Sequence, residues 1–229
     1  MTLRFKALAL SAGLILATGL PAFADKATED FVRKNANLAL ASLNDPNLTH
    51  DQRSVEFQRL MNQFTDIERL SRFVIGKYAR RFSDADMATY KEAYSRYALA
   101  VYEAQLDQYR GNEVVVTGSV DRSDSDSIVD SVIERPQGDL HVKWRVLKDD
   151  DNAEVPYQVV DVALDLDGNL PWLAIEQRAQ FLSLLDRNNG SAAGLIAKIN
   201  EMTDKLKAEA RANRTAAAGG TTGVTSNAG

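Results

Sequence analysis

The segment DLHVKWRVL, residues 139–147, decides the fold class because apolar and polar side chains alternate along it. Successive side chains of a β-strand point to opposite faces of the sheet, so this pattern predicts one buried face and one solvated face. His141, Lys143 and Arg145 belong to the solvated face. The positions predicted to share the buried face are Leu140, Val142, Trp144 and Val146.

Three neighbouring segments, residues 113–120, 126–134 and 156–165, are also rich in β-branched residues with a period of two. Short links rich in Asp, Ser, Gly and Pro separate the four segments, which predicts an antiparallel four-stranded meander. The apolar face of such a sheet must pack against other elements, and the remaining chain has helical periodicity. We therefore expect an α+β fold in which a four-stranded antiparallel sheet packs against several helices.

The sequence before the sheet begins with two predicted helices. Residues 25–48 contain a helix for which Leu38 and Leu43 are the expected anchors, and the turn at Pro46 follows it. A second helix is predicted to start near Thr49, because apolar residues then recur at steps of three and four.

Two further helices are expected between this pair and the sheet. Thr65 and Glu68 have the spacing of a capping box, which predicts a break at Thr65 and then a short helix that ends near Gly76. Ser83, with Asp86 three positions later, opens the longest helix.

A stripe of tyrosines lies along this longest helix. Tyr90, Tyr94 and Tyr97 occur at helical spacing. A tyrosine buries a large ring and keeps a polar tip, so the stripe is consistent either with ordinary core packing or with one wall of an amphipathic pocket.

The chain after the sheet predicts two helices and a tail. Asn169 is the expected cap of the first, with Pro171 in its first turn and Ile175 among its apolar positions. Ser191 opens the last helix. Residues 208–229 are dominated by Ala, Gly, Thr and Asn, which predicts a disordered tail.

The N-terminus, residues 1–24, has the pattern of a secretory signal peptide. Arg4 and Lys6 precede an uncharged run, and Ala22-Phe23-Ala24 provides a small-residue cleavage site. A permanent anchor is the alternative, but the apolar run is shorter than the roughly 20 residues that span a bilayer. We expect cleavage after Ala24, which leaves a mature domain over residues 25–207.

Composition excludes several classes of protein. The chain has no cysteine, so neither disulfides nor thiol chemistry are possible. Loss of Arg4 and Lys6 reduces 27 basic residues to 25 against 32 acidic ones, a net charge of −7. An acidic chain is a poor nucleic-acid binder and adsorbs weakly to anionic lipid surfaces. A cysteine-free chain with a signal peptide favours a bacterial periplasm.

No catalytic or metal-binding motif is evident. His50 and His141 are the two histidines, and neither a GxSxG, a GxGxxG nor a P-loop pattern occurs. The acidic segments 121–130 and 165–169 lack the glutamate that closes a calcium loop, and their composition is typical of tight turns. We expect a binding protein and not an enzyme, with no metal; catalysis by paired carboxylates is the alternative.

Several short motifs follow one another along the mature chain: FTDIER at 64–69, VIG at 74–76, VVDV at 159–162, QRAQF at 177–181 and GLIAKI at 194–199. Their order resembles the MlaC family, also called the toluene-tolerance family, over residues 28–203. The chain departs from the family at residues 164–172, where a Gly-x-Ser motif is usual, and at Tyr157, where a tryptophan is usual.

The resemblance implies a periplasmic carrier that shuttles phospholipid between an outer-membrane lipoprotein complex and an inner-membrane ABC transporter complex, which maintains outer-membrane lipid asymmetry. It implies an apolar cavity between the sheet and the helices, with phospholipid as cargo and no cofactor, metal or covalent chemistry. One branch of the family is associated with hopanoid lipids. The alternatives are therefore a hopanoid-associated lipid carrier, or a non-lipid periplasmic adaptor subunit of an ABC transport system.

The walls of such a cavity should be aliphatic and aromatic, because a buried charge without a partner is costly. Arg80 or Arg81 would lie near the phosphate or on a partner-binding surface, or would simply be solvated. The side chains predicted to contact lipid are Phe73, Val74, Tyr94, Tyr97, Val101, Val116, Val142, Trp144, Val160, Phe181 and Leu185.

Overall fold

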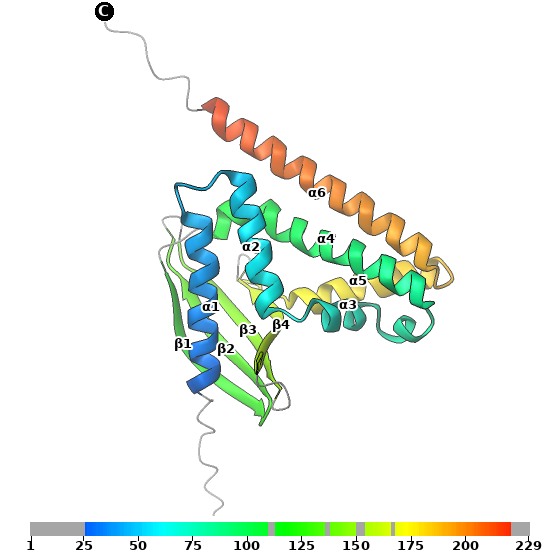
Figure 1. Ribbon diagram of the computed structural model, residues 1–229, viewed down its shortest axis with the longest axis horizontal. Coiled ribbons are helices and arrows are strands. Elements are labelled where there is room, and N and C mark those ends of the chain that lie inside the picture. Colours follow the sequence, from blue (N-terminus) through cyan, green and yellow to red (C-terminus); the bar gives the residue numbers. More distant parts are fainter. Residues whose placement is uncertain (1–25, 110–112, 136–137, 150–153, 166–167, 221–229) are drawn as a thin grey trace, which may run out of the picture.

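The computed structural model describes residues 26–109, 113–135, 138–149, 154–165 and 168–220 (Figure 1). The predicted signal peptide lies outside these residues. The chain forms two adjoining parts: a sheet with one long helix across its face, and a layer of helices that extends to the side of the sheet (Figure 1).

The sheet has the predicted four strands in the order β1-β2-β3-β4, and each neighbouring pair is antiparallel. Val129 of β2 pairs with Trp144 of β3, which in turn pairs with Val162 of β4. The predicted α+β fold is therefore confirmed. The strands are β1 (Val114–Ser123), β2 (Asp126–Ile133), β3 (Leu140–Lys148) and β4 (Tyr157–Leu164).

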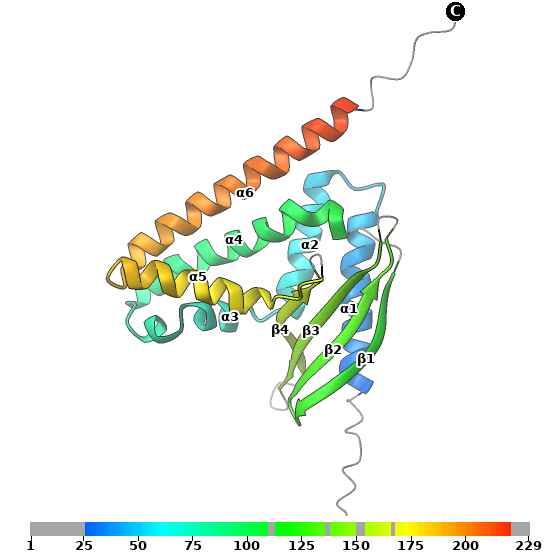
Figure 2. The ribbon, with the colours of Figure 1, turned by 180° about the vertical axis from the view of Figure 1, so that it is seen from behind.

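The predicted alternation along β3 is also confirmed. Val142 and Val146 are buried on the inner face, and His141 is exposed on the outer face. Arg145 donates two hydrogen bonds to the Asp126 carboxylate on the outer face, at 3.1 and 2.9 Å. Within the part of the chain that the structure describes, no helix crosses this outer face (Figure 2), which is consistent with the ion pairs it carries.

Helix α1 (Lys26–Asn44) lies across the inner face of the sheet, and Val32 and Ala36 pack into its core. The Asn37 side chain joins the helix to β1, because it donates to the carbonyl of Val114 and accepts from its N–H at 3.0 and 2.9 Å. Leu43 is buried as predicted, but Leu38 is 46% exposed, so its assignment as an anchor was wrong. The side of α1 opposite Leu38 packs against the sheet.

Helix α2 (His50–Phe64) begins with a capping box between Thr49 and Gln52. The capping box predicted at Thr65 is wrong. Thr65 forms a bridge with Val159 of β4 in extended conformation, so Asp66 caps helix α3 (Ile67–Ile75) by accepting from the N–H of Arg69 at 2.8 Å.

A second core lies between the helices of the lateral layer. Ser83 caps α4 through the N–H of Asp86 at 3.1 Å, as predicted. Tyr90 and Phe181 are fully enclosed, and the Tyr90 hydroxyl donates to the carbonyl of Ser71 at 2.8 Å. The elements of this layer are α3, η1 (Gly76–Arg80), α4 (Asp84–Tyr109), α5 (Leu173–Arg187) and α6 (Ala192–Gly220).

Three predictions at the C-terminal end need correction. Helix α5 begins after Trp172, which makes no side-chain cap, so Asn169 does not cap it. The carboxylate of Asp161 on β4 serves instead, accepting from the N–H of Ala174 at 2.9 Å. Ile175 is 51% exposed and does not anchor the helix. Helix α6 continues to Gly220, so residues 208–220 are helical rather than disordered.

Within the described residues, no helix combines the length and the apolar composition needed to cross a membrane.

Candidate functional site

An apolar cavity of about 90 Å³ lies between α1, α2 and the inner face of the sheet. Among the described residues no charged side chain lines it, and the polar residues of the lining are Asn35 and Thr65. The helices contribute Ala36, Ala39, Phe57 and Phe64, and the sheet contributes Val142 and Trp144, among others. The chain thus places an uncharged cavity where one long helix crosses a sheet.

The cavity exists because small side chains stand where α1 faces its neighbours. Ala36 faces the sheet core and Ala39 faces α2, and both are buried. An alanine leaves room that a leucine would fill, because close packing otherwise leaves few voids in a protein interior. Phe57 and Phe64 of α2 close the remaining side.

The polar groups of the lining are satisfied with one exception. The Asn35 side chain donates to the carbonyl of Phe31 at 2.9 Å, and the indole N–H of Trp144 donates to Ser131 Oγ at 2.8 Å. Thr65 is 6% exposed, and its Oγ1 has no hydrogen-bond partner among the described residues.

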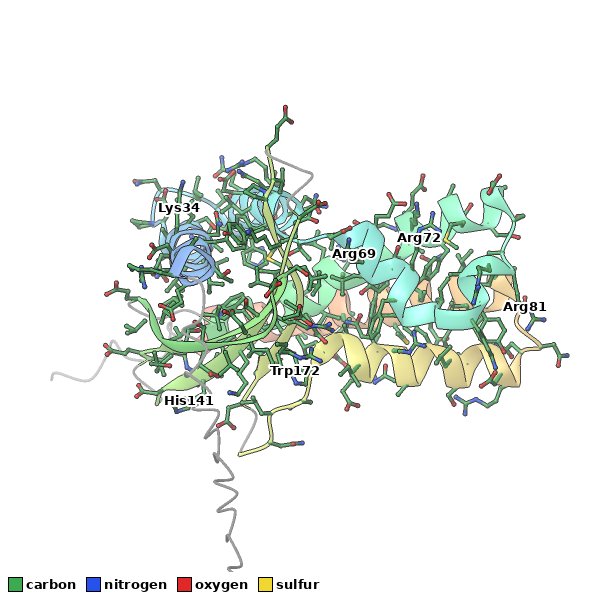
Figure 3. All side chains as sticks on the ribbon, turned by 90° about the horizontal axis from the view of Figure 1, so that it is seen from below. Lys34, Arg69, Arg72, Arg81, His141 and Trp172 are labelled. Atoms are coloured by element: carbon green, nitrogen blue, oxygen red, sulfur yellow. The ribbon has the colours of Figure 1, made fainter. Side chains whose placement is uncertain are left out.

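An aromatic pair joins α1 to the first residue of β4 beside the cavity. The rings of Phe31 and Tyr157 are 5.6 Å apart, and both side chains are half-buried. Phe31 lines the cavity, and Lys34 is exposed one helical turn away on α1 (Figure 3).

The structure divides the predicted lipid-contacting residues. Val142 and Trp144 line the cavity. Val116 and Val160 belong to the sheet but do not line it, and Phe73 is 39% exposed beneath the Arg178 guanidinium, 4.9 Å from its ring centre. The remaining candidates lie in or against the second core of the helical layer: Val74, Tyr94, Tyr97, Val101, Phe181 and Leu185.

Sequence reasoning missed the contribution of α1 and α2 to the lining. Phe57 and Phe64 carried a signal, because their helical spacing marked them as buried. Ala36 and Ala39 carried no such signal, because an alanine that leaves a void cannot be distinguished in the sequence from any other helical alanine. Within the tyrosine stripe, Tyr94 contacts Phe181 edge-on at 6.2 Å and also lines a second, smaller cavity.

A second, smaller cavity of about 30 Å³ adjoins the first between α3, α4, α5 and β4, and Thr65 lines both. Asp161 and Gln177 make it more polar. Burial raises the pKa of Asp161, and the N–H groups of Ala174 and Val162, which donate to its carboxylate, offset part of that rise.

The basic residues near the C-terminus of α3 lie away from the cavity. Arg81 stacks on the ring of Tyr78, 5.1 Å from its centre, at the far end of the helical layer from Lys34 (Figure 3). The Tyr78 hydroxyl donates to Asp186 at 2.5 Å and so lowers the pKa of that carboxyl group. Arg81 is thus placed on an outer tip.

Among the described residues, no group of three or more His, Asp or Glu side chains is arranged to hold a metal ion.

A family model and a solved structure both match this chain. The family model described as MlaC protein matches residues 33–201. No curated protein matches the chain. A solved structure of a phospholipid-binding protein from Ralstonia solanacearum, in complex with a phospholipid, superposes with a TM-score of 0.64. The two chains are 18% identical, and the match covers 78% of this chain and 97% of the other.

Proposed function

The chain belongs to the MlaC family, and we propose that it is a periplasmic carrier that binds phospholipid non-covalently in the cavity between α1, α2 and the sheet. The observation that carries this proposal is the uncharged lining of that cavity. The similar fold of the phospholipid-bound Ralstonia solanacearum protein supports it.

The cavity must widen to admit an acyl chain. Its volume of about 90 Å³ is below the roughly 150 Å³ that holds one benzene molecule and the roughly 300 Å³ at which ligand pockets begin. The described conformation is therefore too closed to hold an acyl chain. Loading moves α1 and α2 away from the sheet, which breaks apolar contacts that the lipid then replaces.

The free energy of burying acyl chains allows lipid to move reversibly between a bilayer and the carrier. Each methylene buried from water contributes about 0.8 kcal/mol, so a bound chain does not escape into the aqueous periplasm. A bilayer buries the same methylenes, so exchange between bilayer and carrier changes the free energy little. Release then depends on the cost of holding the cavity open, which a partner complex can alter.

The wider role follows from the family. We infer that the carrier receives phospholipid at one membrane complex and delivers it at another, between an outer-membrane lipoprotein complex and an inner-membrane ABC transporter. The signal peptide predicted at residues 1–24 supports a periplasmic location. The described lining of the cavity offers no acidic or basic side chain, which favours carriage over catalysis.

Lipid extraction from the purified protein, followed by mass spectrometry, tests the proposal. The expected result is co-purified phospholipid and its uptake from phosphatidylethanolamine–phosphatidylglycerol vesicles after delipidation. Delipidated protein that keeps its circular dichroism spectrum but takes up no phospholipid would refute the carrier function. That outcome would favour the non-lipid adaptor, whereas recovery of a polycyclic lipid alone would favour the hopanoid-associated carrier.

A further inference from the structure

The hydroxyl group of Thr65 is an exception in a well-satisfied interior. The residue is 6% exposed, and its Oγ1 has no hydrogen-bond partner among the described residues. Buried polar groups in native proteins nearly always have partners, because an unpaired one loses its hydrogen bonds to water without replacement. Such a group indicates strain, a bound water molecule or a ligand.

Thr65 stands where the two cavities meet. It ends α2 in extended conformation and bridges to Val159 of β4, and both residues line both cavities. On the side of the apolar cavity the neighbours are hydrophobic. On the other side, Asp161 and Gln177 supply polar atoms, and Asp161 is itself 7% exposed.

The polar groups on that side are positioned by other contacts. Asp161 Oδ1 accepts from the N–H groups of Val162 and Ala174, at 2.8 and 2.9 Å. The Oε1 atom of Gln177 accepts from the Tyr94 hydroxyl at 2.9 Å. These contacts hold both side chains at the small cavity.

We propose that Thr65, Asp161 and Gln177 form a hydroxyl-binding subsite beside the apolar cavity, which takes one hydroxyl group carried by an otherwise apolar lipid chain. This inference rests on the proposed lipid-binding function. A cavity of about 30 Å³ exceeds the roughly 10–15 Å³ that one water molecule requires, so it has room for one small polar group. An anionic group is excluded because the buried Asp161 carboxyl disfavours negative charge beside it.

Opening of the carrier would expose the subsite. Thr65 lies on the wall formed by α2, which must move when an acyl chain enters. Its Oγ1 is enclosed in the closed conformation and becomes reachable once the apolar cavity widens, while the bridge to Val159 keeps Thr65 beside Asp161. A chain with a hydroxyl at the right depth would satisfy the threonine, whereas an unsubstituted chain would leave it unpaired.

The test compares octadecanoic acid with hydroxyoctadecanoic acids substituted at carbon 3, 10, 12 or 17, bound to the delipidated protein. We expect at least one position to bind roughly fivefold more tightly than octadecanoic acid, which is the effect of one hydrogen bond. Thr65→Val, which keeps the shape and removes the hydroxyl, should abolish that preference. Thr65→Ser, which retains the hydroxyl, should preserve it.

The outcomes separate this inference from the function on which it rests. Equal binding of all the acids by the wild-type protein, or a preference that persists in Thr65→Val, overturns the subsite alone. Failure of every acid and of phospholipid to bind overturns the carrier function, and the subsite with it. Melting curves of both variants establish that they fold.

Discussion

Filling the cavity should stabilise the empty protein and weaken lipid binding at the same time. Ala36 of α1 is 8% exposed and lines the cavity, so Ala36→Leu places three additional carbon atoms inside it. Ala41 is exposed on the same helix, in the open groove between α1 and α2, and provides the matched control, because Ala41→Leu makes the same change outside the cavity.

The gain in stability can be calculated from the volume. A void of about 90 Å³, at ~24 cal/mol for each Å³, costs the closed protein about 2 kcal/mol. Ala36→Leu recovers up to that amount, which urea unfolding of the delipidated protein measures. Ala41→Leu should change the free energy of unfolding by less than about 0.5 kcal/mol.

The loss of lipid binding has a similar size. The new leucine occupies space that about three methylenes of an acyl chain would fill, at about 0.8 kcal/mol each. We therefore expect phospholipid affinity to fall by about 2 kcal/mol, or roughly 30-fold. Titration of delipidated protein with vesicles containing a fluorescent phospholipid measures this, with Ala41→Leu expected to match the wild type.

The paired readouts make the reasoning refutable. Higher stability with unchanged uptake would mean that the lipid does not occupy this cavity. Lower uptake in both variants would mean that the outer side of α1, and not the cavity, determines uptake. A loss of stability in Ala36→Leu would show that the site is already closely packed.

Three other perturbations test the surrounding fold. Burial raises the pKa of Asp161, so the folded state binds more protons and wild-type stability falls as pH rises above the ordinary value near 3.8. The stability of Asp161→Asn should lack this fall with rising pH, as measured by urea unfolding across pH 4–7. A variant whose stability changes with pH as the wild type does would contradict the prediction. Gly76→Ala should lower the free energy of unfolding by about 1–3 kcal/mol, because the φ of Gly76 is 50° and a Cβ would lie 2.6 Å from the Arg178 guanidinium. A variant as stable as the wild type would show that the backbone around Gly76 adapts. Thr49→Ala removes the capping box of α2 and should cost about 1 kcal/mol by thermal unfolding; an unchanged melting temperature would show that the cap contributes little.

The sheet was predictable because its signal is local. The alternation along residues 139–147 follows from burial of one face, and short turns leave an antiparallel meander as the simplest connection. The residues that end up on the inner face of β3 are those that the period predicted. The resemblance in motif order added the family, which the match over residues 33–201 supports.

The cavity was harder to predict because it depends on contacts between distant segments. Nothing in the local sequence of α1 shows that Ala36 will face the sheet, or that the helix crosses it at all. The prediction placed the lipid against Tyr94 and Phe181, whose size marked them as buried. In the structure the rings of Tyr94 and Phe181 pack against each other. Large rings fill the space between the helices, whereas the cavity lies where α1 carries small side chains.

The cap of α5 failed for a related reason. Asn169 has the expected residue type and spacing for a local cap, but a carboxylate 13 positions before Ala174 takes the role. Thr65 likewise looked like a cap and instead bridges to β4. Tertiary pairing overrides a local hydrogen-bonding preference when the segment is drawn against a sheet edge.

Photo-crosslinking locates the bound lipid most directly. The delipidated protein is loaded with a phospholipid that carries a diazirine near the end of one acyl chain, irradiated and mapped by peptide mass spectrometry. The account predicts adducts on the inner sides of α1 and α2 and on the residues around Val142 of β3. Adducts confined to the helical layer around Tyr94 and Phe181, or an absence of adducts despite lipid uptake, would contradict it.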